Sequence, residues 1–373
     1  MSRLTGDFLR ILSISAVMVI HASYGQEVEF QKHHDFFSAS FAGILINQIS
    51  RFCVPVFILL SGYGLTMRYG NVLKREIGFS FALDFYKKRF LKIGIPFVFW
   101  TVFLLAVFGR FSLEGSLTGI IASNIAILLK FLFVKGADYH FYFFTIILEC
   151  YLLYPLLLKY RSPILFSLLL FVQIIYIYPV TVSSFTGIPL IRFPSSFFVH
   201  WIFYFYLGMI SADKKVLEKI KKIPVIPFGI LFAVFTGYVV QEYIRRSMTE
   251  NDPGYYNHFN RLSVFLYAVS FWILFVKLDG ILEAIFRQRK LAVWITYFSG
   301  LSFGVYIYHT MILRVINLTF LEGSLAVLPL VILISFGSVW GIDKLIRINF
   351  MRIIAGLPEL PVPEKEENSP SKT

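Results

Sequence analysis

Long apolar runs recur from one end of the chain to the other, and they restrict the possible folds more than any other feature. A helix of about 20 apolar residues crosses the hydrocarbon core of a membrane and satisfies its own backbone hydrogen bonds there. With 57% hydrophobic and only 15% charged residues over 373 positions, the chain is too apolar for a soluble domain of this length. The sequence therefore predicts an all-α, polytopic membrane protein. The apolar runs lie near residues 8–24, 41–66, 93–109, 117–134, 141–158, 164–179, 197–211, 224–242, 260–277, 297–319 and 324–343.

Basic residues decide how many of these eleven runs cross the membrane. Lys and Arg gather in the segments 74–92, 214–222, 277–290 and 344–352, each beside an apolar run. Loops rich in Lys and Arg stay in the cytosol. If every run crossed, the first of these segments would lie inside and the other three outside. One run before residue 214 must therefore fail to cross.

The run at 117–134 is the weakest of the set. Gly119, Asn124 and Lys130 interrupt it, and its Ile and Leu residues suit an interfacial or re-entrant helix on the outer side. Removing it from the count places every later basic segment in the cytosol. We therefore predict about ten transmembrane helices with both termini cytosolic. The outer face then receives the segments 25–40, 110–140, 180–196, 243–259 and 320–323.

The chain divides into a transmembrane domain, residues 1–357, and a short tail, residues 358–373. The tail PELPVPEKEENSPSKT is rich in Pro, Glu, Ser and Lys and cannot bury a core. We predict that it is disordered, cytosolic and dispensable.

Charge and cysteine content exclude two other classes of site. The net charge of +13 comes from clusters beside apolar runs, so it indicates membrane topology and predicts no nucleic-acid partner. Cys53 and Cys150 both fall inside apolar runs, so we expect small core residues rather than a disulfide or a metal site.

Two ionisable residues, Arg10 and His21, lie in the first apolar run. They are eleven positions apart, which is three helical turns plus about 20°, so both project from one face about 16 Å apart along the axis. A charge within a bilayer costs about 2.5–3.5 kcal/mol on insertion scales, so the pair marks a functional-site hypothesis. Two other interpretations stay open. Arg10 can snorkel to the surface while His21 bonds a neighbouring helix, or residues 1–25 can form a secretory signal, against which Asp7 argues.

Histidines recur in the outer half of the predicted bundle. His21 ends the first span, His140 opens the fourth, His200 opens the sixth and His309 lies past the middle of the ninth. No HxxxH or HxxE spacing joins them, so we expect no metal site.

Further ionisable residues accompany the same spans. Glu149 is near the centre of the fourth span, Arg51 accompanies the second, and Arg314 lies one turn outward of His309. Polar groups in lipid must face a cavity or one another. We therefore predict a polar chamber between the helices that opens outward, has Glu149 at its floor and is reached from the cytosol past Arg10.

Five stretches resemble the acyltransferase-3 family of membrane acyltransferases, which modify surface glycans and related acceptors. Arg10 and His21 match that family's signature of Arg, ten residues and His in the first helix. The chain departs from the family pattern at Ser13, where many members have a second basic residue, and at Tyr142, where Trp is usual. The other four stretches are VPVFILLSGYGL at 54–65, FYKKRFLKIGIPFVFW at 85–100, HFYFFTIILECYLLYPLL at 140–157 and FGVYIYHTMIL at 303–313.

The resemblance implies an O-acyltransferase that moves an acyl group, commonly acetyl, from cytosolic acyl-CoA to a hydroxyl of a cell-envelope glycan or lipid-linked sugar. Acyl-CoA is then a co-substrate, and no cofactor is expected. The implied location is the bacterial cytoplasmic membrane, as a multi-pass protein in contact with the lipid bilayer. The implied catalytic residues are His21 as general base, because an imidazole accepts a proton near neutral pH, together with Arg10 and Glu149.

Each substrate would contact a different set of predicted residues, with CoA at the inner end of the bundle. The phosphates of CoA suit the cations Arg10, Lys87, Lys88 and Arg89 at the inner mouth. The same basic cluster equally suits anchoring by the positive-inside rule. The further substrate-binding residues that we predict are His140, Tyr142, His309 and Arg314.

A transporter or flippase for a polysaccharide or lipid-linked sugar is the alternative. In that case Arg10, Glu149 and the histidines would form a proton relay, and no CoA would bind. The sequence lacks paired Gly- or Pro-broken helices in corresponding halves, which favours the enzyme.

Overall fold

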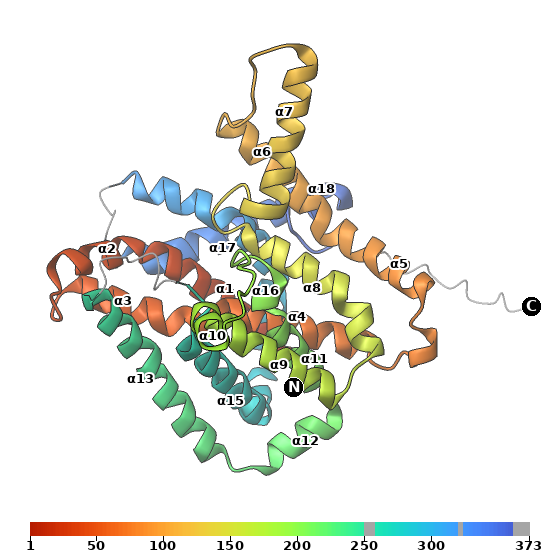
Figure 1. Cartoon of the computed structure of the whole chain (residues 1–373), viewed down its shortest axis with the longest axis vertical. Coiled ribbons are helices and arrows are strands. Elements are labelled where there is room, and N and C mark those ends of the chain that lie inside the picture. Colours follow the sequence, from red (N-terminus) through yellow and green to blue (C-terminus); the bar gives the residue numbers. More distant parts are fainter. Residues whose placement is uncertain (250–257, 320–323, 361–373) are drawn as a thin grey trace, which may run out of the picture.

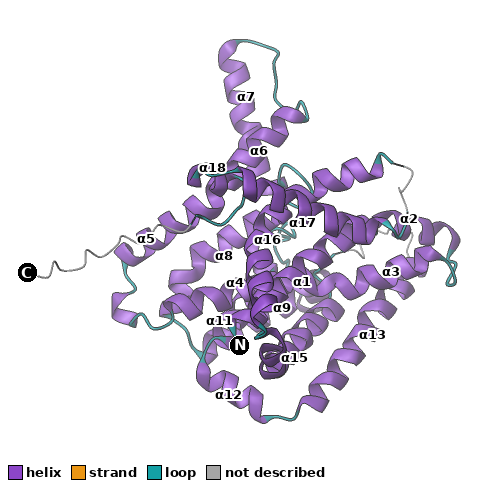
Figure 2. Ribbon diagram, turned by 180° about the vertical axis from the view of Figure 1, so that it is seen from behind, coloured by secondary structure: helices purple, strands orange, loops and turns teal. Residues whose placement is uncertain are grey.

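The chain is helical throughout the part described by a computed structural model, which comprises residues 1–249, 258–319 and 324–360 (Figure 1, Figure 2). No strand occurs in these residues. Eight helical segments among them are long and apolar enough to cross a membrane, which confirms the prediction of an all-α, polytopic membrane protein. They are α1 (Arg3–Ala22), α3 to α4 (Ala39–Tyr69), α5 to α6 (Phe79–Val107), α8 (Tyr142–Lys159), α13 (Val225–Thr249), α15 (Leu262–Phe286), α16 (Arg289–Asn317) and α17 (Val327–Leu345).

Two shorter apolar helices, α9 (Pro163–Ile177) and α11 (Ile202–Ser211), correspond to the other two of the predicted spans. α11 has 10 residues and is about 15 Å long, roughly half the thickness of the hydrocarbon core. Nearly all of its residues are buried by neighbouring helices. Its short length is therefore compatible with a membrane, because protein rather than lipid surrounds its ends.

The run that we excluded from the spans forms α7 (Leu117–Lys130). None of the residues of α7 is buried. It projects from the rest of the bundle, and α6 lies at the base of this projection (Figure 1, Figure 2). Its position on the outer side of the membrane stays a prediction.

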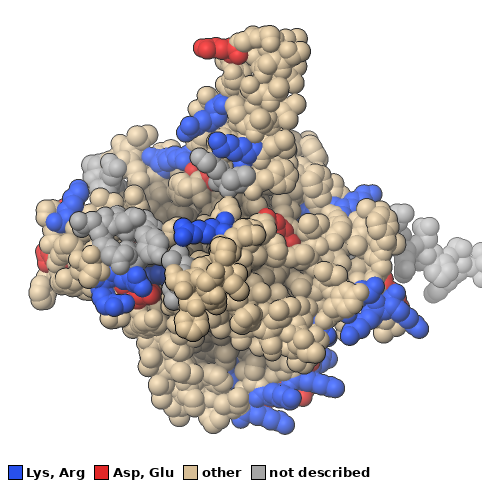
Figure 3. Space-filling model, viewed as in Figure 1, with Lys and Arg blue, Asp and Glu red and all other residues tan. Residues whose placement is uncertain are grey.

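Short elements join the long helices and carry many of the basic residues. On the face drawn in Figure 3, Lys and Arg gather over α12 and near the exposed end of α5, and a broad uncharged surface separates them from other Lys and Arg on the opposite side. Clusters of basic residues beside apolar helices are typical of a membrane protein. The short elements are α2 (Tyr24–His33), η1 (Ser50–Phe52), η2 (Lys74–Glu76), η3 (Phe90–Gly94), η4 (Phe131–Lys135), α10 (Pro179–Thr186), η5 (Phe198–His200), α12 (Lys214–Lys222) and α18 (Asn349–Ile354).

α1 lies in the interior of the bundle and packs against α3, α4, α15, α16 and α17. Leu9, Ile14 and Met18 on this helix have no exposed surface, and the small Ser13 is buried as well. A helix with neighbours on several sides presents its polar residues to the interior rather than to lipid. The helix that carries Arg10 and His21 is therefore the one around which the others assemble.

The closest helix contact joins α4 (Cys53–Tyr69) to α11 through two glycines. A Cβ atom at Gly62 would lie 2.0 Å from the carbonyl oxygen of Phe205, and one at Gly208 would lie 2.1 Å from that of Leu59. Small residues let helix backbones touch, and such packing drives helix association where lipid removes the hydrophobic force. Gly62 is the glycine of the SGY sequence noted above.

The long segment from α5 (Phe79–Arg89) to α6 (Ile95–Val107) contains a wide π turn at η3. Pro96 has no N–H group to donate, so the regular ladder of backbone hydrogen bonds is interrupted at this point. A Cβ atom at Gly94 would lie 2.4 Å from the ring of Phe90, so the turn favours glycine there. The KKRFLKIGIP sequence therefore encodes a local change of helix pitch.

The C-terminal end of the described chain is folded. Arg352 Nε donates to the carbonyl oxygen of Pro358 at 2.7 Å, and the N–H of Leu360 donates to Asn349 Oδ1 at 2.9 Å. The folded part thus extends three residues past the predicted boundary at 357. The rest of the predicted tail, 361–373, lies outside the described residues, as do the predicted outer segment 320–323 and residues 250–257 of another.

Replacing either glycine of the α4–α11 contact should destabilise the protein. The methyl group added by Gly62→Ala or Gly208→Ala would overlap a backbone carbonyl, and such overpacking costs about 1–3 kcal/mol or more. Both variants should therefore show a lower Tm in detergent. Gly229→Ala is the matched control, because nothing lies within 4 Å of its Cβ position, and its Tm should match or exceed that of the wild type. Equal Tm values for all the proteins would contradict this contact.

The predicted topology can be tested with single cysteines, because Cys53 and Cys150 are buried and should give little background labelling. An impermeant thiol reagent applied to intact cells should label Ser116→Cys, which is predicted to lie outside, and should not label Lys219→Cys, which is predicted to lie in the cytosol. Both side chains are exposed, so a difference in labelling reports the side of the membrane. Ser211 is not a suitable position, because it is only 2% exposed. Labelling of Lys219→Cys from outside would mean that α7 also crosses the membrane.

Candidate functional site

The described residues enclose two cavities that bear on the predicted site. The first, which we call the basic cavity, has a volume of about 520 Å³ and contains the cations Arg10, Arg68, Arg89 and Lys92 in its lining. The second, the outer cavity, has a volume of about 720 Å³ and has His21 in its lining.

The two cavities lie end to end, because the same helices line both at different positions along their length. On α1, Arg10 lines the basic cavity and His21 the outer one. On α16, Ser299 to Tyr306 face the basic cavity, whereas Leu313 to Asn317 face the outer one. No described residue lines both cavities. A wall of side chains therefore separates them.

Arg10 is held at the basic cavity by two partners. Its Nη1 donates to Asp7 Oδ1 at 2.8 Å and to Ser299 Oγ at 3.0 Å, and Ser299 Oγ also donates to Asp7 Oδ1 at 2.8 Å. The Arg10 side chain is nevertheless 40% exposed. It can therefore bind an anion in the cavity while its position is fixed from behind. Sequence analysis missed Asp7 as a partner, although the spacing of three residues on one helix indicates such a pair.

Three imidazoles cluster between the cavities. The ring centroid of His309 lies 5.4 Å from that of His21 and 4.9 Å from that of His140. His309 and His140 are 0% and 2% exposed, so only His21 reaches a cavity. His309 Nδ1 contacts the carbonyl oxygen of Tyr306 at 2.8 Å, which requires a proton on Nδ1 and leaves Nε2 as an acceptor. Tyr306 itself lines the basic cavity, so the imidazole cluster and Tyr306 belong to the wall.

The outer cavity is lined by aromatic rings, amides and arginines. Such side chains can contact a ligand through ring faces and through hydrogen bonds from amide or guanidinium groups. These groups surround His21 on the side away from the basic cavity. They include Tyr24, Tyr139, Tyr142, Trp201, Asn260, Asn317, Arg51 and Arg314.

Asp138 is a buried carboxylate that sequence analysis missed, because it lies outside every apolar run. Its Oδ1 accepts a hydrogen bond from Arg314 Nη2 at 2.8 Å, and its Oδ2 accepts one from the Thr310 hydroxyl at 3.1 Å. His140 Nδ1 lies 3.7 Å from the same Oδ2. Asp138 therefore connects the loop before α8 to α16 and positions Arg314 at the outer cavity. The short spacing of Asp138 and His140 was the available sequence signal.

A second buried polar network supports the end of α1 that carries His21. Asn47 Nδ2 donates to the carbonyl oxygen of Ile20 at 3.2 Å and to Ser23 Oγ at 2.9 Å. Asn47 Oδ1 accepts from Arg51 Nη2 at 2.7 Å, and Arg51 in turn lies 3.5 Å from Glu27. Arg51 thus contributes to a brace for α1 as well as to the lining of the outer cavity. Sequence analysis noted Arg51 but not its partners.

Comparison with known proteins identifies the family. The family model described as an acyltransferase domain matches residues 6–343, which is most of the chain. The chain belongs to the acyltransferase-3 family. No curated protein and no solved structure matches. As an acyltransferase, the protein must bring an activated acyl group and its acceptor to one point, and the wall between the two cavities is the place where predicted residues from three helices meet.

The structure groups most of the predicted site residues of this acyltransferase. His21, His140 and His309 form one cluster, Tyr142 and Arg314 line the outer cavity with His21, and Arg10 and Arg89 line the basic cavity. Arg68 and Lys92 join the basic cavity although sequence analysis did not single them out.

Four predicted residues lie apart from the cavities of the acyltransferase. Lys87 and Lys88 are exposed on α5 and do not line the basic cavity. Glu149 accepts a hydrogen bond from the N–H of Phe198 at 2.7 Å and lines neither cavity, so it does not form the floor of the outer one. His200 lies beside Asn260, with its Nδ1 at 2.9 Å from the amide nitrogen. Among the described residues, no group of His, Cys, Asp and Glu could hold a metal ion.

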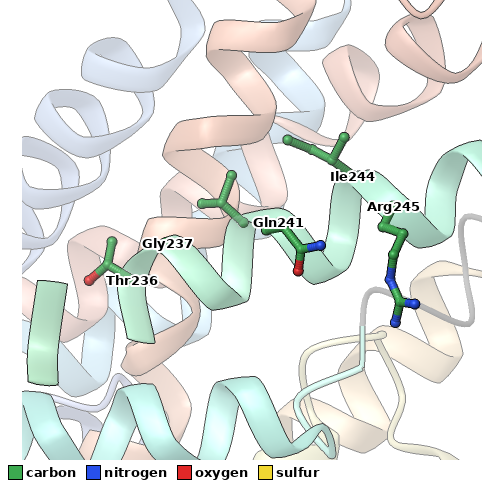
Figure 4. A pocket seen from close by; sticks show the side chains of 6 residues that line it. Thr236, Gly237, Gln241, Ile244 and Arg245 are labelled. Carbon is green, nitrogen blue, oxygen red and sulfur yellow. The ribbon is translucent and has the colours of Figure 1, made fainter. Parts of the chain in front are cut away.

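A further groove, of about 420 Å³, runs along α13 and contains none of the clustered histidines in its lining (Figure 4). All of its lining residues come from this single helix, so nothing opposite closes it around a substrate. It does not contribute to the site of the acyltransferase. The lining residues are Thr236, Gly237, Val240, Gln241, Ile244 and Arg245.

Proposed function

We propose that this acyltransferase moves an acyl group, most simply acetyl, from acyl-CoA in the basic cavity to a hydroxyl group of a cell-envelope glycan or lipid-linked sugar in the outer cavity. The observation that supports this most directly is the position of His21. It lines the outer cavity and stacks on His309, at the wall that separates this cavity from the cations of the other. Acyl transfer to a hydroxyl needs a general base beside the acceptor oxygen, and the imidazole of His21 at that wall can act as this base.

The basic cavity suits a donor with several phosphate charges. Arg10, Arg68, Arg89 and Lys92 converge there from α1, α4 and the α5–α6 segment. Arginine binds phosphate oxygens through paired, charge-assisted hydrogen bonds. Acyl-CoA carries phosphates and is made in the cytosol. The proposal therefore has the basic cavity opening to the cytosol, in agreement with the positive-inside rule.

The outer cavity suits a neutral polyhydroxylated acceptor held by aromatic and amide groups. Its volume of about 720 Å³ is in the range of small-molecule sites, so one or a few sugar units could enter. The acceptor hydroxyl would come to His21 from the side opposite the donor. We place the protein in the bacterial cytoplasmic membrane, where such an acceptor can be reached from the outer face.

The reaction can be written with the residues of the wall. His21 takes the proton of the acceptor hydroxyl as its oxygen attacks the thioester carbonyl. The C–S bond then breaks, the ester forms, and the proton passes from His21 to the departing CoA thiolate. His309 packs against His21 and is itself fixed by the Tyr306 carbonyl, so it would hold the base in position.

The wall must let the thioester reach His21. Phe143 and Tyr306 line the basic cavity, and the neighbouring residues Tyr142 and His309 lie on the side of the outer cavity or inside the wall. Rotation of one aromatic side chain would join the two spaces when the donor is bound. A closed wall in the absence of donor would exclude water from the thioester.

Arg10→Ala should weaken CoA binding to the purified protein. The loss of a charge-assisted contact costs about 1.5–3 kcal/mol, which corresponds to a roughly ten- to hundredfold higher Kd in calorimetry. Arg10→Lys should rescue only part of this loss, because Lys lacks the planar fork. Arg3→Ala is the matched control, since the Arg3 side chain is 84% exposed yet approaches the same Asp7. A wild-type protein without affinity for CoA would refute the proposal in favour of the transporter.

His21→Ala and His21→Gln should abolish acyl transfer while CoA affinity stays near wild type. Loss of a general base typically lowers the rate about 10²–10⁴-fold, and Gln cannot accept a proton at neutral pH. The assay follows labelled acetyl from acetyl-CoA into an envelope glycan fraction. His33→Gln, at a side chain that is 65% exposed on α2, should retain full activity. A His21→Gln protein with more than about a tenth of the wild-type rate would assign the base to another residue, with His309 next to test.

A further inference from the structure

The basic cavity is closed on one side by a segment that the family match does not include. The match ends at residue 343, whereas Ile353, Gly356, Leu357, Pro358 and Glu359 all line the basic cavity. We call residues 353–359 the C-terminal strap. Sequence analysis assigned its last two residues to a dispensable tail, so their position at the cavity requires another explanation.

The C-terminal strap is fixed in place by specific contacts. Trp100 Nε1 on α6 donates to the carbonyl oxygen of Ile354 at 2.8 Å. Gly356 has a φ of +70°, and a Cβ atom there would lie 3.0 Å from the backbone of Gly304 on α16. Arg352 is 4% exposed and pairs with Asp343 of α17. The C-terminal strap therefore contacts α6 and α16, is linked to α17 through Arg352, and lines the cavity in a fixed position.

Glu359 is the one carboxylate among the described residues that line the basic cavity, where it accompanies four cations. The carbonyl oxygen of Pro358 accepts from Arg352 at 2.7 Å, and the N–H of Leu360 is bonded to Asn349, so the backbone is held on both sides of Glu359. Lys92 lines the same cavity. The Glu359 side chain itself is exposed.

We propose that Glu359 determines the affinity of the donor site by acting as a counter-ion that competes with the donor phosphates. In the empty cavity its carboxylate partly neutralises the cations. When an anionic donor binds, the carboxylate is repelled by the phosphates and moves away from them. Glu359 thereby weakens the binding of acyl-CoA and of the product CoA alike, and it speeds release of the product. This inference rests on the proposed function, because it takes the basic cavity to be the donor site.

The test is a CoA titration of purified full-length protein by calorimetry. Glu359→Gln keeps the shape and removes the charge, so the Kd for CoA should fall about three- to fivefold at low salt. The gain should be smaller for dephospho-CoA, which carries less charge, and should shrink above about 0.5 M salt because of screening. Glu359→Asp keeps the charge and should bind CoA like the wild type. Glu218→Gln, which removes an exposed carboxylate on α12, is the control for net charge and should leave the Kd unchanged.

The outcomes separate this inference from the function on which it rests. If the wild type binds CoA but Glu359→Gln binds it with equal or weaker affinity at every salt concentration, Glu359 is not a counter-ion and the inference fails alone. If the wild type does not bind CoA, the proposed function and the inference both fail. In the acyl-transfer assay, Glu359→Gln should lower the KM for acetyl-CoA without raising kcat, whereas a merely structural role would lower Tm and raise KM.

Discussion

Each charge inside this bundle is stabilised by a partner, and the arrangement of helices depends on that requirement. An isolated charge in a bilayer costs about 2.5–3.5 kcal/mol on insertion scales, so an arginine within a span must bind a carboxylate or face water. Most partners come from another element, and such pairs join two parts of the chain. Arg314 of α16 reaches the loop before α8, and Arg10 also reaches Ser299 of α16. Among the described residues, the buried or half-buried pairs include Arg10–Asp7, Arg51–Glu27, Arg261–Glu242, Arg314–Asp138 and Arg352–Asp343.

Separation of the two cavities would keep water away from a reactive donor until the acceptor reaches the wall. A donor thioester and an acceptor from the other face would meet only at the wall, where His21, His309 and Tyr306 pack together. A continuous channel would admit water to the thioester and allow ions to cross. A wall of aromatic and imidazole side chains excludes both, and it strengthens electrostatic interactions because the local dielectric constant is low.

Sequence analysis predicted how far along a helix each polar side chain lies better than the direction in which that side chain projects from the helix. The spacing of Arg10 and His21 indicated that both project from one face of a regular helix, and each lines a cavity. The single chamber that we predicted is instead two cavities that share no lining residue among those described. Glu149 was predicted at the floor of the chamber from its height in α8, but neighbouring helices set the rotation of α8 and direct this carboxylate to the N–H of Phe198. Asp138 was missed because it lies in a loop, and only tertiary packing brings it beside Arg314. Apolar runs and basic segments predicted about ten spans, of which eight are long helical segments and two are the shorter helices α9 and α11 among the described residues. The short, buried α11 depends on close contact with α4.

Two irregular turns contribute residues to the basic cavity, and the membrane as a solvent restricts where such turns can occur. Lipid does not satisfy free N–H and C=O groups, so non-helical turns within the hydrocarbon region survive only where protein or a water-filled cavity covers them. The π turn at η3 supplies Lys92, and the turn at Gly356 leads to Glu359. The π turn interrupts the long segment from α5 to α6, whereas the turn at Gly356 follows α18. Lys92 and Glu359 therefore reach the basic cavity from irregular segments, whereas regular helices α1 and α16 carry His21 and His309.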